Sequence, residues 1–284
     1  MLSRPVAAGA LAARDRNRGF VHGLLVGLLG TACSTAPPYA GWTPEQLYEH
    51  GQRAFSEGDW TEARRAFERL VLNFPGFGQA VEARHYLARA FFEDEEYLSA
   101  VGEYTRIVQV YPDDERASSA WMGLCRSYAA MSPHPQRDQQ HTVQARNTCR
   151  QVAGDFYGRP IGDSAAAVAT EMHDRLGEHA FEVGQHYFRH KLYESAEHVF
   201  RLLLDDYPDT EAAPRALSRL IEVYEDWGWD DQREETRVRL MSTYPDSPEA
   251  RALDATARGD TLSTVRSRAP PARGLPPEWS PAAA

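Results

Sequence analysis

Four pairs of an aromatic residue followed by proline divide the chain into segments of similar length. The first two pairs are 37 residues apart, as are the last two, while 96 residues separate the middle two. Those 96 residues hold two periods of 37 and 22 more. The pairs are Phe74-Pro75, Tyr111-Pro112, Tyr207-Pro208 and Tyr244-Pro245. A fixed period of this length is typical of repeat proteins, in which each unit stacks on its neighbours.

Small and large residues also recur at fixed positions before three of these prolines. In the first unit they are Gly51, Trp60, Ala63 and Phe67. The second unit has Ala88, Tyr97, Ala100 and Tyr104, and the fourth has Gly184, Tyr193, Ala196 and Phe200. The third opens with Trp121, Leu124, Cys125 and Tyr128 and continues at Ala145 and Cys149. Small residues allow two antiparallel helices to approach closely, and proline ends the second helix because it lacks a backbone donor.

This pattern resembles the tetratricopeptide repeat, a helix–turn–helix unit. The resemblance implies an all-α fold, a right-handed helical solenoid of about five repeats. Thr43 and Gln46 predict a capping box for the first helix, with Pro44 at its first position.

The expected organisation has five parts: a lipoprotein signal peptide (1–32), a lipidated linker (33–43), repeats one to three (44–160), a long helix with repeats four and five (161–253), and a disordered tail (254–284) rich in Pro, Ala, Arg and Ser. Repeat three carries an inserted loop, Met131 to His141. Repeat four opens with a long helix from about Ser164 to His190. Arg233 and Arg237 replace small and aromatic residues in repeat five, as expected of a polar terminal cap.

The N-terminal segment predicts secretion and a lipid anchor. Three arginines precede an apolar run from Gly19 to Ala32 that is broken only by His22. At about 14 residues this run is too short to span a bilayer. Leu29-Gly30-Thr31-Ala32 followed by Cys33 resembles the bacterial lipobox, although Gly30 stands where leucine is usual. An ordinary signal peptide with an incidental cysteine is the alternative. Ser34 favours the outer membrane, so we expect Cys33 to be lipidated and the protein to be anchored at its periplasmic face.

Charge and missing motifs exclude several functions. The chain has 31 basic and 41 acidic residues, and removing the leader takes away four arginines and one aspartate, which leaves a net charge of −13. Such a surface repels nucleic acid, so no nucleic-acid partner is expected. The sequence has no nucleophile elbow, glycine-rich phosphate loop, metalloprotease motif or CxxC pair. We therefore expect no enzymatic activity and no cofactor.

The loop of repeat three carries a second resemblance. Residues 137–142 read Arg-Asp-Gln-Gln-His-Thr and are followed by Ala145. This segment and the order of the repeats are similar to the BamD family, lipoproteins of the β-barrel assembly machinery. The resemblance implies a scaffold that binds the periplasmic (POTRA) domains of BamA through its later repeats and unfolded outer-membrane proteins through its earlier ones, beside other subunits of the machinery. Arg137 and Asp138 belong to the family segment, and Asp138 is expected to cap the next helix. Another periplasmic repeat adaptor, linked to the cell envelope or division, is the alternative.

The repeat pattern also predicts a groove. Its expected residues are Tyr48, Gln52 and Phe55 in repeat one, His85, Arg89 and Phe92 in repeat two, and Met122 and Arg126 in repeat three. Aromatic residues with arginines suit an extended apolar peptide that ends in a carboxylate, because arginine pairs with carboxylate bidentately. In the alternative, these side chains pack against neighbouring repeats.

Two further clusters have open interpretations. Cys125 and Cys149 lie on facing helices of repeat three, and they would form either a disulfide in the oxidising periplasm or two small core residues. His179, Glu182, His186 and His190 share one helix face. These positions face solvent in this kind of repeat, so no metal site is predicted.

Overall fold

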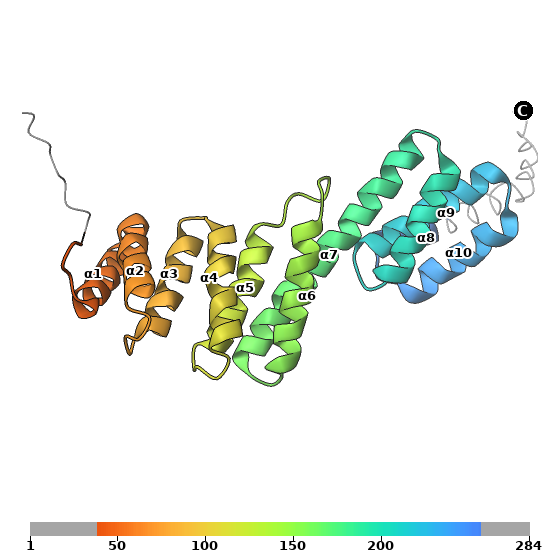
Figure 1. Cartoon of the computed structure of the whole chain (residues 1–284). Helices are drawn as coiled ribbons and strands as arrows, with labels where there is room; N and C mark the ends of the chain where they lie inside the picture. Colours follow the sequence, from red (N-terminus) through yellow and green to blue (C-terminus); the bar gives the residue numbers. More distant parts are fainter. Residues whose placement is uncertain (1–38, 257–284) are drawn as a thin grey trace, which may run out of the picture. The chain divides into compact units, whose positions relative to one another are not determined.

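The computed structural model describes residues 39–256, and in this range all regular structure is helical. Figure 1 shows the helices following one another in chain order. Their bounds are α1 (Pro44–Glu57), α2 (Trp60–Asn73), α3 (Ala80–Glu93), α4 (Tyr97–Val110), α5 (Ala117–Ala130), α6 (Gln140–Asp155), α7 (Pro160–Arg189), α8 (Tyr193–Asp206), α9 (Ala212–Trp227) and α10 (Asp230–Thr243).

Each helix packs on the next one in the chain. The first helices of successive repeats also touch one another: α1 contacts α3, α3 contacts α5, α5 contacts α7, and α7 contacts α9. This nearest-neighbour packing confirms the predicted all-helical repeat solenoid.

The start of α1 follows the predicted capping box. The backbone N–H of Gln46 donates to Thr43 Oγ1 at 3.3 Å, and that of Thr43 donates to Gln46 Oε1 at 2.9 Å. These bonds satisfy two amides that have no partner within the helix.

The recurring glycine and aromatic residue meet as expected. A Cβ placed on Gly51 would lie 2.8 Å from ring atoms of Phe67, so only glycine fits between α1 and α2 without rearrangement. Phe67 is fully buried, and its ring stacks on Tyr86 of α3 with centroids 5.4 Å apart. Phe67 thus joins repeat one to repeat two. Gly184 and Phe200 repeat the same close approach between α7 and α8.

The long helix α7 starts earlier than predicted, at Pro160 rather than near Ser164. Proline suits the first helical position, because its missing N–H would have no partner there. The inserted loop is also shorter than predicted. Helix α5 ends at Ala130 and α6 begins at Gln140, so His141 is helical.

This loop, residues 131–139, is held by α7. Arg175 donates to the carbonyl oxygen of Ser132 at 3.1 Å, and His179 Nδ1 bonds the carbonyl oxygen of Pro135. Repeat four therefore fixes the conformation of a loop that belongs to repeat three.

The C-terminal end of the array differs from the expected boundary. Residues 248–256 are helical, so the part of the predicted tail from 254 to 256 is ordered. The apolar Ala250 and Leu253 pack against the core formed by α7–α10, which explains the extra helix. In α10 only Leu240 is buried, as suits a polar last repeat. Residues 1–38 and 257–284, with the leader, Cys33 and the rest of the tail, lie outside the described residues. Among residues 39–256, no helix is long and apolar enough to cross a membrane.

Candidate functional site

A cavity of about 380 Å³ lies on α3, α4 and α5, between repeats two and three. Five of the eight predicted groove residues line it: His85, Arg89, Phe92, Met122 and Arg126. Its other lining residues are Glu93, Tyr104, Ser119, Gly123 and Ile161. The three groove residues expected from repeat one lie outside this cavity.

The guanidinium of Arg89 lies over two aromatic rings. Its guanidinium carbon lies 4.7 Å from the ring centroid of Phe55 and 5.8 Å from that of Tyr86. The Phe55 ring also packs edge-on against Tyr86 of α3, in repeat two, with centroids 5.2 Å apart. Phe55 therefore packs against the neighbouring repeat, while its cation–π contact holds Arg89 beside the cavity.

Arg126 lies on α5 and is exposed. Neither it nor Arg89 makes an ion pair with any residue that the structure describes. Other arginines of these repeats are neutralised: Arg84 pairs with Glu103 at 2.5 Å. Since Glu93 is the only carboxylate in the cavity lining, the two arginines give this site an excess of positive charge.

His85 forms part of the wall and is uncharged near neutral pH. Its Nε2 lies 3.0 Å from Ser119 Oγ, and its ring packs edge-on against Tyr104. Burial, together with the nearby positive charges of Arg89 and Arg116, lowers the pKa of His85 to about 4. The positive charge of the cavity therefore comes from its arginines.

The remaining predicted groove residues have mainly structural contacts. Gln52 Nε2 donates to the Tyr48 hydroxyl at 2.8 Å, and Tyr48 packs edge-on against Phe67. The pKa of Tyr48 is raised mainly by burial and, to a smaller extent, by a hydrogen bond to Glu82. Met122 is only 7% exposed, so little of it can touch a ligand.

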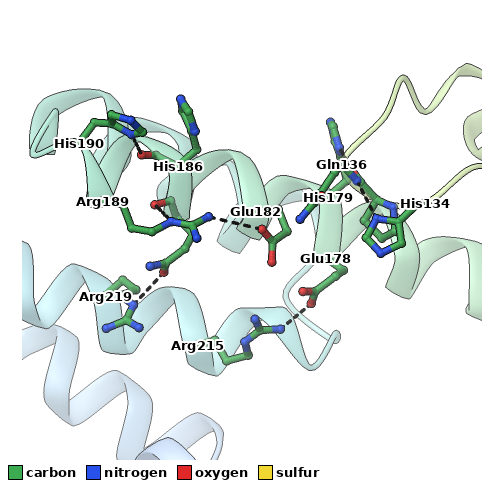
Figure 2. Close-up of polar contacts among 12 residues, drawn as sticks. His134, Gln136, Glu178, His179, Glu182, His186, Arg189, His190, Arg215 and Arg219 are labelled. Carbon is green, nitrogen blue, oxygen red and sulfur yellow. Dashed lines mark hydrogen bonds and ion pairs between the residues drawn. The ribbon is translucent and has the colours of Figure 1, made fainter.

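A second surface lies between repeats four and five, where α7 faces α9 (Figure 2). The guanidinium carbon of Arg215 lies 3.9 Å from the ring centroid of Phe181, and that of Arg219 lies 5.2 Å from the ring centroid of Phe188. Unlike Arg89 and Arg126, these arginines have carboxylate partners: Arg215 pairs with Glu178 at 2.5 Å and Arg219 with Glu222 at 2.6 Å. This surface therefore has less free charge to offer a carboxylate ligand.

His179 and His186 of α7 lie beside that surface and line a cavity of about 410 Å³ together with Pro135 and Gln136 of the loop. His179 Nδ1 bonds the carbonyl oxygen of Pro135, so this histidine is engaged within the protein. As Figure 2 shows, His190 Nδ1 bonds the carbonyl oxygen of His186 at 2.8 Å, and Glu182 pairs with Arg189 at 3.8 Å. Within residues 39–256, no group of three or more ligating side chains could hold a metal ion.

Repeat three contains a disulfide between Cys125 of α5 and Cys149 of α6, whose Cα atoms are 4.9 Å apart. Both cysteines are fully buried in a cluster with Met122, so the bridge lies directly behind the cavity. In the family segment, Asp138 Oδ1 accepts a hydrogen bond from the backbone N–H of Gln140 at 2.9 Å, at the start of α6. The Arg137 side chain is exposed.

Sequence reasoning missed half of the cavity lining: Glu93, Tyr104, Ser119, Gly123 and Ile161. The repeat pattern identifies Tyr104 only as the large packing residue of its unit. Glu93 and Ser119 are on the same helices as predicted residues, at helical spacing of four and three from Arg89 and Met122. Ile161 comes from repeat four, and no spacing within repeats two and three could reveal it.

The comparison with protein families covers most of this array. The family YfiO, described as outer membrane lipoprotein, matches residues 41–240. The chain belongs to this family. The match includes all ten repeat helices except the end of α10, and with them the whole cavity of repeats two and three.

Curated relatives agree with the YfiO assignment. The outer membrane protein assembly factor BamD of Vibrio cholerae is 24% identical over 238 residues, covering 79% of this chain and 98% of that protein. The factor of the same name from Caulobacter vibrioides is 23% identical over 221 residues, covering 78% and 72%. The predicted resemblance to the BamD family is confirmed. Among solved structures, a thermophilic tetratricopeptide-repeat protein of Thermus thermophilus is 20% identical, covering 76% of this chain and 98% of that one, with a TM-score of 0.32.

Proposed function

We propose that this chain is a non-enzymatic scaffold lipoprotein of outer-membrane protein assembly, anchored through Cys33 at the periplasmic face of the outer membrane. Its client site is the cavity of repeats two and three, which binds the C-terminal segment of an unfolded outer-membrane protein. The observation that carries the proposal is an aromatic-lined cavity with two arginines that lack a carboxylate partner among the described residues. The names of the curated relatives, which are assembly factors, support the same role.

The client site can be tested by fluorescence anisotropy with the full mature chain. The probe is a ten-residue peptide of alternating apolar and polar residues that ends in phenylalanine, either as the free acid or amidated. A hydrogen bond to a charged group contributes about 1.5–3 kcal/mol, and partial exposure favours the lower figure, so the free acid should bind about tenfold more tightly.

Arg126→Gln should remove most of this preference. Arg69→Gln is the matched control, because Arg69 is exposed on α2 and outside the cavity. Equal affinity of the wild-type chain for the acid and the amide would reject carboxylate recognition.

The second half of the array is proposed to bind the periplasmic domains of BamA. Its separate aromatic and arginine surface on α7 and α9 supports this division, because helical repeats depend mainly on their neighbours. In pull-downs with the full chain, Arg219→Glu should weaken capture of these domains and Arg126→Gln should not. The reverse result would contradict the division.

The anchor and the alternative function need separate measurements. Cys33→Ser should leave the chain uncleaved or soluble in the periplasm, and retention of the variant in the outer-membrane fraction at high salt would count against lipidation. Affinity purification of the membrane-extracted protein should recover assembly-machinery subunits. Recovery of division or cell-wall proteins instead would favour the adaptor alternative.

A further inference from the structure

The cavity of repeats two and three has a wall that belongs to repeat four. Nine of its ten lining residues come from α3, α4 and α5, and the tenth is Ile161, the second residue of α7. Helix α5 contacts both α3 and α7, whereas α3 and α7 make no contact with each other in the described range. Ile161 therefore bounds the cavity on the side of α5 away from α3.

This wall exists because α7 is longer than the first helices of the other repeats. Helix α1 begins seven residues before Gly51, whereas α7 begins 24 residues before the equivalent Gly184. The N-terminal extension packs on α5 and α6 and brings its first turn to the cavity. An ordinary repeat of this chain would leave the same place open.

The wall is fixed in position. Gly158 adopts a left-handed conformation with φ of 74°, and Pro160 occupies the first position of α7, so the turn before Ile161 has little freedom. Gly162 packs against the backbone of Phe156 with no room for a side chain. Ile161 itself packs against the cluster that holds Met122 and the Cys125–Cys149 disulfide.

Next to this wall, Arg126 is the cation available to a ligand. The guanidinium of Arg89 already lies over two aromatic rings, and His85 is neutral, whereas the Arg126 side chain is exposed and has no ion pair in the described residues. Repeat three thus combines a free positive charge with an apolar barrier beyond it.

We propose that Ile161 and Arg126 together form an end stop that selects a chain terminus over an internal segment. This inference rests on the proposed client function. The bound peptide places its terminal carboxylate on Arg126, and Ile161 prevents the chain from continuing. Internal stretches of a client with the same alternating sequence are rejected because their backbone would have to pass through this wall.

The test uses the full mature chain and three labelled peptides: the ten-residue free acid, its amide, and the same peptide extended beyond its phenylalanine by Gly-Ser-Gly-Ser. Wild type should bind the free acid about tenfold more tightly than the amide, because the amide loses the carboxylate contact. It should bind the extended peptide at least about threefold more weakly than the amide, because that peptide loses the same contact and also meets Ile161. Ile161→Ala should raise the affinity for the extended peptide to about that for the amide, while the preference of about tenfold for the free acid over the amide remains. Arg126→Gln should remove most of the preference over the amide.

Controls separate a specific effect from damage to the fold. Ile161→Val should retain most of the discrimination, and Arg69→Gln should leave all three affinities at wild-type values. Each variant must melt within a few degrees of wild type. If wild type binds the extended peptide as tightly as the amide, the end stop is wrong while peptide binding stands. If no peptide binds, the proposed client site and the end stop both fail.

Discussion

The contact between Gly51 and Phe67 gives a sharp test of how the repeats pack. Replacing a helical glycine by alanine normally stabilises a helix by about 0.5–1 kcal/mol. At Gly51 the added Cβ would meet the Phe67 ring at 2.8 Å, and overpacking of this kind costs about 1–3 kcal/mol. Gly102, in the middle of α4, is exposed and a Cβ added there would have nothing within 4 Å, so it provides the matched control.

We therefore expect Gly102→Ala to raise the free energy of unfolding by about 0.5–1 kcal/mol and Gly51→Ala to fall about 1–3 kcal/mol below that variant. For a chain of this size, the difference corresponds to about 2–12 °C in melting temperature, measurable by circular dichroism at 222 nm. Phe67→Leu should relieve part of the penalty when combined with Gly51→Ala, which a double-mutant cycle would reveal. Equal stabilisation by both glycine replacements would refute the close-approach argument.

Three other perturbations probe different parts of the array. Cys125→Ala with Cys149→Ala should lower the free energy of unfolding by about 3 kcal/mol, because the bridge closes a loop across 24 residues, and denatured wild type should show two additional thiols only after reduction. Because the pKa of His85 is lowered to about 4, the unfolded chain binds more protons than the folded chain between pH 6.5 and 4. The free energy of unfolding, measured by chemical denaturation, should therefore fall by about 1 kcal/mol from pH 7 to pH 5 in wild type and by less in His85→Gln. Phe200→Ala, at a fully buried site, should cost about 3–5 kcal/mol and speed hydrogen exchange in α7–α10 while leaving α1–α4 near wild type.

Features within one repeat could be predicted from the sequence. The positions of Gly51 and Phe67 follow from the period, and the Thr43–Gln46 capping box follows from local chemistry. Each depends on residues that are close in sequence or one helix apart. The same reasoning places Cys125 and Cys149 on facing helices.

Features that depend on contacts between repeats could not be predicted in the same way. The early start of α7 and the position of Ile161 result from packing on α5 and α6. The repeat pattern assigns Arg89 and Arg126 to one stripe, yet the structure gives them different surroundings, because Phe55 and Tyr86 lie under only the first. Helical periodicity identifies which face of a helix is exposed, but not which side chain of the next repeat packs against that face.

The continuous helix α7 also limits which insertions and deletions the protein can tolerate. Every residue inserted within this helix would turn all that follows by about 100° and advance it by about 1.5 Å, since the helix has no joint to absorb the change. An insertion in the loop of residues 131–139 would leave that phase intact. Natural insertions and deletions should therefore accumulate in the loop and be excluded from the middle of α7, except for lengths near seven residues, which restore the helical phase to within about 20°.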